Sequence, residues 1–137
     1  MPETDALSWA RANTPVLQSL AAEHATDTPF AGLTVAVATH LEAKSGVLVE
    51  TLATAGASVA FAPSEPQSTH GDVVEVLDAQ DGITAYAWEG MSDDEFADAQ
   101  HALLETEEPD IILDDGCELI AKVHADHPAV AEEVLGG

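Results

Sequence analysis

Residues that could transfer protons and hold a polar ligand follow three apolar runs of this sequence. The run TVAVATH ends at His40, and the run IILDDG contains Asp114 and Asp115. After the first run come Leu41, Glu42, Ala43 and Lys44, and after the run SVAFAP come Ser64, Gln67, Ser68, Thr69 and His70. An imidazole, hydroxyls and a carboxylate are the groups that enzymes use for proton transfer and for binding polar ligands.

Each of these candidates also has a purely structural interpretation. His40 could end a strand and cap a neighbouring element. Ser68 and Thr69 are ordinary residues for the N-cap of a helix. The run from Asp114 to Gly116 is a common strand-to-helix turn, so residue spacing alone leaves both interpretations open.

Four other histidines and the single cysteine are weaker candidates for a catalytic or metal site. His24, His101, His124 and His127 fall on predicted helices or helix ends, where we expect solvated surface. The spacing of His124 and His127 suits a metal, but no third ligand accompanies them, so we predict no metal site. Cys117 cannot form an internal disulfide, and we expect it to be a small buried residue. The sequence has no Gly-x-Gly-x-x-Gly or Walker-type loop that could hold a dinucleotide or a nucleoside triphosphate.

Strands that alternate with helices must position the candidate residues. Apolar runs predict strands at 34–40, 58–63, 83–88 and 110–116. Helices are predicted at 6–24, 43–56, 72–80, 92–105, 118–127 and from Pro128 to Leu135, with Pro15 expected to kink or split the first.

This alternation predicts an α/β fold with a doubly wound, mainly parallel sheet, Rossmann-like or flavodoxin-like, and an N-terminal helix. The strands are almost wholly apolar, as expected when helices cover both faces of a sheet. Ligands of such sheets bind at the carboxyl ends of the strands. We therefore expect His40, Asp115, Ser68 and Thr69 to meet at one edge.

Length and charge limit the classes of protein and partner. The 137 residues suffice for a single domain spanning 1–137. Three basic residues, Arg11, Lys44 and Lys122, face 26 acidic ones, for a net charge of −23. Free nucleic acid and anionic membranes are therefore excluded as partners. The acids are spread along the chain and predict a solvated acidic surface, as in proteins of salt-loving organisms; the alternative is an ordinary acidic protein.

No targeting or membrane segment is visible in the sequence. The first residues, Met-Pro-Glu-Thr-Asp, lack the basic and apolar regions of a signal peptide, and no apolar run reaches transmembrane length. We expect a cytoplasmic protein.

Four ordered motifs resemble the substrate-binding part of adenosylhomocysteinases, over nearly all of residues 8–137. The run GLTVAVATHLEAKSGVLVETLATAGASVAFAPSEPQSTHGDV is similar to that family's first strand, its HLEAKTAVL-type motif, VETL, and an NPLSTQDDV-like turn. ITAYAWEGMSDDEFADA resembles its AWKGET-EEY region, and IILDDGCELIAKVHADHPAV resembles its ILDDGGDL region. WARANTPVLQSL resembles the helix before the first strand.

The resemblance implies an activity and roles for individual residues. Enzymes of this family cleave S-adenosylhomocysteine to adenosine and homocysteine, after a tightly held NAD oxidises the ribose 3′-hydroxyl. His40 and Asp115 match the family's active-site His and Asp, which handle protons near the 5′ leaving group and the attacking water. Leu41, Glu42 and Lys44 match positions around the adenine and substrate pocket, and Ser68 and Thr69 match a hydroxyl pair of the same cleft.

The sequence departs from the family pattern at several positions. Ser45 and Gly46 replace Thr and Ala, Gly71 replaces an acid, and Cys117-Glu118 replaces Gly-Asp. The sequence also stops before the family's Glu-Glu-Thr-Thr-Thr-Gly segment and before the NAD-binding domain. We therefore expect a truncated substrate-binding domain that is inactive alone and binds no NAD by itself, with a complementary NAD-binding chain or a full-length homologue as a possible partner.

Two other functions are compatible with parts of this sequence. One is a non-catalytic module that binds adenosine-like ligands or regulates a complete enzyme. The other is a flavodoxin-like signalling domain, which is weaker because it needs a Lys at a strand end. Lys44 and Lys122 both fall in predicted helices.

Overall fold

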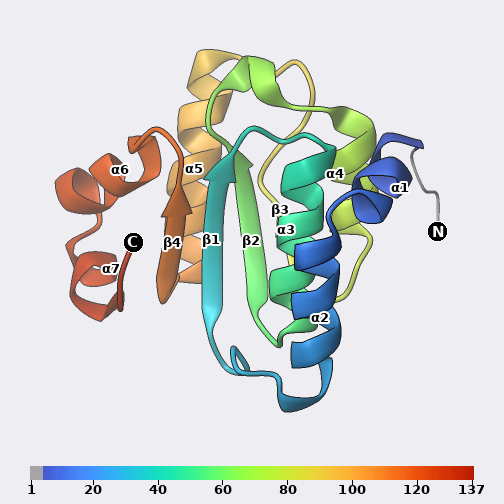
Figure 1. Cartoon of the computed structure of the whole chain (residues 1–137). Helices are drawn as coiled ribbons and strands as arrows, with labels where there is room; N and C mark the ends of the chain where they lie inside the picture. The colour runs from blue at the N-terminus through green and yellow to red at the C-terminus, as the bar shows by residue number, and fades with distance from the viewer. Residues whose placement is uncertain (1–4) are drawn as a thin grey trace.

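A four-stranded parallel sheet forms the centre of the computed structural model, which describes residues 5–137 (Figure 1). Residues 1–4, at the start of the segment analysed for a signal peptide, lie outside this description. The strands are β1 (Thr34–Thr39), β2 (Ser58–Pro63), β3 (Ile83–Ala85) and β4 (Ile111–Asp114), in the spatial order β3-β2-β1-β4. The predicted α/β class with a parallel sheet is confirmed.

Helices connect the strands as the sequence pattern predicts. They are α1 (Asp5–Ala12), α2 (Pro15–Asp27), α3 (Ala43–Thr54), the 3-10 turn η1 (Pro66–Ser68), α4 (Gly71–Asp78), α5 (Asp93–Glu107), α6 (Glu118–Asp126) and α7 (Pro128–Glu133). Pro15 does split the predicted first helix, into α1 and α2. Ser92 and Glu95 form a capping box that fixes the start of α5.

The third strand is shorter than the sequence pattern predicts. The prediction of 83–88 was wrong in extent, because β3 ends at Ala85. Tyr86 still donates its backbone N–H to the carbonyl of Phe61 at 2.8 Å. The next bond of the ladder needs an N–H from residue 63 of β2, and Pro63 has none, so pairing stops there.

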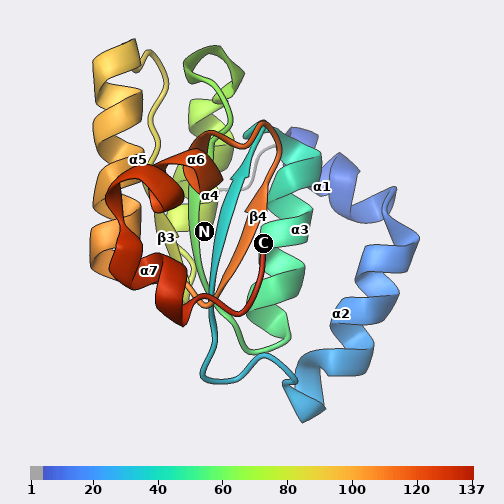
Figure 2. The same ribbon diagram turned by 90° about the vertical axis from the view of Figure 1, so that its left-hand side faces the viewer.

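Alternate strand residues build two separate cores. Valines and Phe61 point to the side of α3 and α4, while four alanines point to the side of α5, α6 and α7: Ala36, Ala38, Ala60 and Ala62. Helices α1 and α2 lie outside α3 (Figure 2). A Cβ on Gly46 would lie 3.2 Å from Leu7 and 3.3 Å from Val73, so glycine at this position of α3 lets α1 and α4 approach closely.

Three side chains lie in surroundings that the sequence does not predict. Cys117 is exposed, not buried, because it stands at the N-cap of α6 where the chain turns outward with a φ of 64°. His127 is only 9% exposed and His101 is partly buried, so the expectation of solvated surface was wrong for both. The packing of α5 against the junction of α6 and α7 encloses them, whereas His124 is exposed as predicted. None of the helices within residues 5–137 is both long and apolar enough to cross a bilayer.

Candidate functional site

The order of the strands reverses between β1 and β4. The chain passes from β1 to β2 and β3 on one side, and then places β4 on the other side of β1. In open α/β sheets, ligand crevices form at the carboxyl ends of the strands beside such a switch point. His40 follows β1 and Asp115 follows β4, and the backbone N–H of Asp115 donates to the carbonyl of Ala38 at 2.9 Å. His40 and Asp115 therefore stand at neighbouring strand ends.

The ring of His40 is open to solvent and faces a carboxylate. Its side chain is 53% exposed, and its Nδ1 lies 3.7 Å from Oε1 of Glu65, in the loop after β2. An accessible imidazole beside a carboxylate can accept and return a proton. Glu65 was not predicted, because it is one of 26 acidic residues and no spacing pattern singles it out.

The two adjacent aspartates after β4 do different things. Oδ2 of Asp114 accepts a hydrogen bond from the backbone N–H of Ile120 at 2.9 Å and so caps the first turn of α6. The interpretation as a strand-to-helix turn therefore holds for Asp114. Asp115 is exposed at the edge of the sheet, where a carboxylate can meet a ligand or a water molecule.

Leu41 joins two loops of the site through its backbone. Its N–H donates to the carbonyl of Ser68 at 2.8 Å, and its carbonyl accepts from the N–H of His70 at 3.0 Å. The Leu41 side chain is 1% exposed and packs in the core beneath α3 and α4. The backbone of Leu41 thus ties the loop after β1 to the loop after β2.

Neither hydroxyl of the Ser68-Thr69 pair caps a helix. Ser68 donates its hydroxyl to the carbonyl of Glu65 at 2.9 Å, and the N-cap of α4 is His70. Thr69 is 7% exposed, and its Oγ1 has no hydrogen-bond partner among the described residues. Buried hydroxyls normally have a partner, so a ligand or a water molecule is the natural partner for this one.

Glu42 and Lys44 stand at the start of α3, next to His40. Glu42 is the N-cap residue of α3, but its side chain forms no capping hydrogen bond. Lys44 is exposed in the first turn. Together they offer a carboxylate acceptor and an ammonium donor beside the same strand end.

The described residues do not fit a dinucleotide or a metal. The turn from β1 to α3 is His40-Leu41-Glu42 and lacks the glycines that let a backbone approach a pyrophosphate. Within residues 5–137, no group of three or more His, Cys, Asp or Glu side chains is placed to hold a metal ion.

Comparison with known proteins gives a consistent result. The family model for S-adenosyl-L-homocysteine hydrolase matches residues 4–135. The adenosylhomocysteinase of Halobacterium salinarum is 41% identical over 131 residues, which are 96% of this chain and 30% of that protein. The S-inosyl-L-homocysteine hydrolase of Methanopyrus kandleri is 42% identical over 132 residues, 96% of this chain and 31% of that protein. The chain thus spans about a third of the length of these curated relatives, and it belongs to the S-adenosyl-L-homocysteine hydrolase family.

Proposed function

We propose that this chain is the substrate-binding part of an adenosylhomocysteinase-type enzyme and holds an adenosine-containing ligand at the carboxyl edge of its sheet. The proposal depends on one observation above all: His40 and Asp115 follow the two strands that flank the topological switch point. Family membership supports the same choice of edge.

In this proposal the residues of the three loops have different roles in proton transfer and ligand binding. His40 and Asp115 transfer protons near the 5′ carbon, to and from the leaving homocysteine and the attacking water. Ser68 and Thr69 belong to the third loop of the proposed site, in which the Thr69 hydroxyl is buried and unpartnered and the Ser68 hydroxyl donates to Glu65. Glu42 and Lys44 bind at the purine end of the ligand.

NAD supplies the hydride acceptor in the family's reaction, and the described loops do not fit it. Without prior oxidation at the 3′ position, His40 and Asp115 cannot acidify the unactivated C–H bond next to it enough for elimination. We therefore expect the 137-residue chain alone to bind nucleoside without releasing homocysteine. A non-catalytic adenosine-binding or regulatory role is the second candidate.

The base of the ligand at the proposed site can be adenine or hypoxanthine. The haloarchaeal relatives are named adenosylhomocysteinases, and the methanogen relatives are named S-inosyl-L-homocysteine hydrolases. Adenine presents an amino donor at carbon 6, and hypoxanthine presents a carbonyl acceptor there. Glu42 can accept from the former and Lys44 can donate to the latter, so adenosine and inosine should both be tested.

The direct experiment is a titration of isotope-labelled chain with adenosine, inosine and NAD, followed by NMR. Adenosine or inosine should shift the amide signals of residues 40–42, 68–70 and 115–117. Replacing Thr69 by Val should weaken nucleoside binding about tenfold, the loss of roughly one buried hydrogen bond. The exposed Thr84 of β3 provides the matched control, because Thr84→Val should leave the affinity for nucleoside unchanged.

A parallel assay for homocysteine release distinguishes the candidates. Homocysteine release by the pure chain would contradict the expectation that these 137 residues are inactive alone. Release only after a separate NAD-binding chain is added would show a split enzyme and contradict the non-catalytic role. Nucleoside-induced shifts confined to other parts of the chain would contradict the proposed site.

A further inference from the structure

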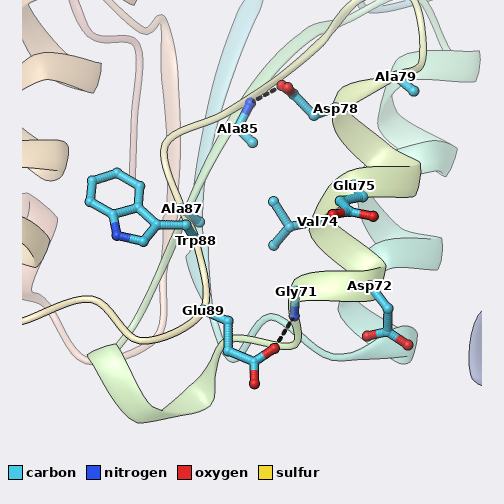
Figure 3. A pocket seen from close by; sticks show the side chains of 10 residues that line it. All are labelled: Gly71, Asp72, Val74, Glu75, Asp78, Ala79, Ala85, Ala87, Trp88 and Glu89. Atoms are coloured by element: carbon cyan, nitrogen blue, oxygen red, sulfur yellow. Dashed lines mark hydrogen bonds between the residues drawn. The ribbon is translucent and has the colours of Figure 1, made fainter.

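Two carboxylates connect the walls of a groove beside α4 (Figure 3). The groove has a volume of about 730 Å³ and lies between α4 and residues 85–89, which lead from β3 toward α5. At one end, Oε2 of Glu89 accepts a hydrogen bond from the backbone N–H of Gly71 at 3.2 Å. At the other end, Oδ1 of Asp78 accepts from the backbone N–H of Ala85 at 2.8 Å.

The Glu89 end of the groove adjoins the candidate site. Gly71 directly follows the segment Ser68-Thr69-His70. In this segment the carbonyl of Ser68 accepts from the N–H of Leu41, and the N–H of His70 donates to the carbonyl of Leu41. Leu41 in turn follows His40. A continuous set of hydrogen bonds therefore leads from Glu89 to the loop after β1, whereas the Asp78 bond lies at the far end of α4.

Glu89 supplies what the start of α4 otherwise lacks. The N-cap residue His70 forms no side-chain capping bond. The first N–H groups of a helix need acceptors, and a negative charge there interacts favourably with the helix dipole. A carboxylate that reaches this end from another loop both satisfies one N–H group and holds the helix start against that loop.

Glycine at position 71 makes room for this contact. A Cβ on Gly71 would lie 2.8 Å from Oε2 of Glu89. A side chain at position 71 would therefore displace the Glu89 carboxylate from the backbone N–H that it binds.

We propose that Glu89 is a positioning residue for the Ser68–His70 loop of the candidate site and that Gly71 and Glu89 form a matched pair. The contact holds the loop in place relative to Leu41, and thereby sets where the Thr69 hydroxyl meets a ligand. This proposal rests on the proposed function for its ligand, but the loop coupling itself can be measured without one.

The first measurement is amide hydrogen exchange on the full 137-residue chain. Glu89→Ala removes the hydrogen bond from the N–H of Gly71 to a charged carboxylate. The loop that carries His70 should then open more often, and exchange at the amides of Leu41 and His70 should become about tenfold faster. Glu75 lines the same groove and is exposed, so Glu75→Ala is the matched control and should leave both amides unchanged. Asp78→Ala should speed exchange near Ala85 only.

The second measurement is adenosine affinity with a rescue. Glu89→Lys alone and Gly71→Asp alone should each weaken adenosine binding severalfold, and the double variant should recover most of it, since the introduced ammonium and carboxylate can then connect the same loop to the start of α4 as an ion pair. Glu89→Gln keeps an acceptor and should lie between wild type and Glu89→Ala.

The outcomes separate the two proposals. Unchanged exchange at Leu41 and His70 in Glu89→Ala would overturn the positioning role, as would an unchanged adenosine affinity in a wild-type chain that binds adenosine. If the wild-type chain binds neither adenosine nor inosine while Glu89→Ala still speeds exchange at these two amides, the proposed function fails and the loop coupling stands.

Discussion

Nδ1 of His101 lies 2.8 Å from Nε2 of His127, a contact that joins the middle of α5 to the junction of α6 and α7. One ring must donate and the other accept, so at least one of them is neutral while the contact exists. Beyond α7, Leu135 and Gly136 bond to the outer side of β4. The histidine pair therefore helps to hold the last helices against the sheet.

A double-mutant cycle at this pair should reveal a coupling. His101→Ala and His127→Ala should each lower the free energy of unfolding, and the coupling between them should be about 1 kcal/mol, the net value of one hydrogen bond. Chemical denaturation measures it. The exposed His124→Ala should stay within about 0.5 kcal/mol of wild type. Strictly additive losses would show that the pair contributes only packing.

Replacing Cys117 by Gly should stabilise the protein. Cys117 has a φ of 64°, a left-handed conformation that strains any residue with a Cβ. Glycine stands at this position in the similar motif ILDDGGDL, and it should raise the free energy of unfolding by about 1 kcal/mol. Cys117→Ala keeps the Cβ and should give no such gain. Equal thermal stability of the two variants would contradict the explanation by strain.

Tyr86 should ionise only at unusually high pH. Burial, and then the hydrogen bond and charge of Glu107, raise its pKa above the ordinary value of about 10. The stabilisation linked to this group is thus present below pH 10 and is lost as the pH rises through the higher pKa of the folded state. Tyr86 is the only tyrosine, so tyrosinate absorbance reports it directly. Glu107→Gln should lower the titration midpoint; a midpoint unaffected by this change would exclude the Glu107 contribution.

Thermal stability should rise with salt. The net charge of −23 means that the acidic side chains repel one another across the folded protein. Raising salt from 0.1 M to 1 M shortens the screening length from about 10 Å to about 3 Å and so weakens this repulsion. Circular dichroism across a KCl series should show the melting temperature increasing. Sucrose at equal osmolality is the control for general solute effects. A melting temperature independent of KCl would contradict adaptation to high salt.

The elements of the fold could be predicted from the sequence, because their signals are local. The apolar runs at 34–39 and 58–63 and the capping residue Ser92 lie within a few residues of the structure they form. Alternation also bears on the two aspartates: Asp114 shares a face with Ile112 and Ala38, under the helices, while Asp115 lies past the strand. The alternation of side chains along a strand, with its period of two, therefore separates the two aspartates.

Contacts between loops could not be predicted in the same way. Glu65 near His40 and Glu89 at Gly71 come from elements far apart in the chain, and each is one acid among 26. The pairing of His101 with His127 depends on how α5 packs against the end of α6. Such contacts follow from three-dimensional packing, for which residue spacing carries no signal.

The two edges of the sheet differ in a way that limits polymerisation. Gly82 and Tyr86 bond to β2, so Ile83 and Ala85 face the open side of β3, and their N–H groups are already bonded to Gln80 and Asp78. On the other side, β4 pairs with an added segment, since Ile112 donates to Gly136 at 3.1 Å. Fibre growth requires pairing at both edges of every copy. The donors of β3 are bonded to the backbone carbonyl of Gln80 and the carboxylate of Asp78, and β4 is covered by Gly136, so both edges of the described sheet are poor templates for growth by strand addition.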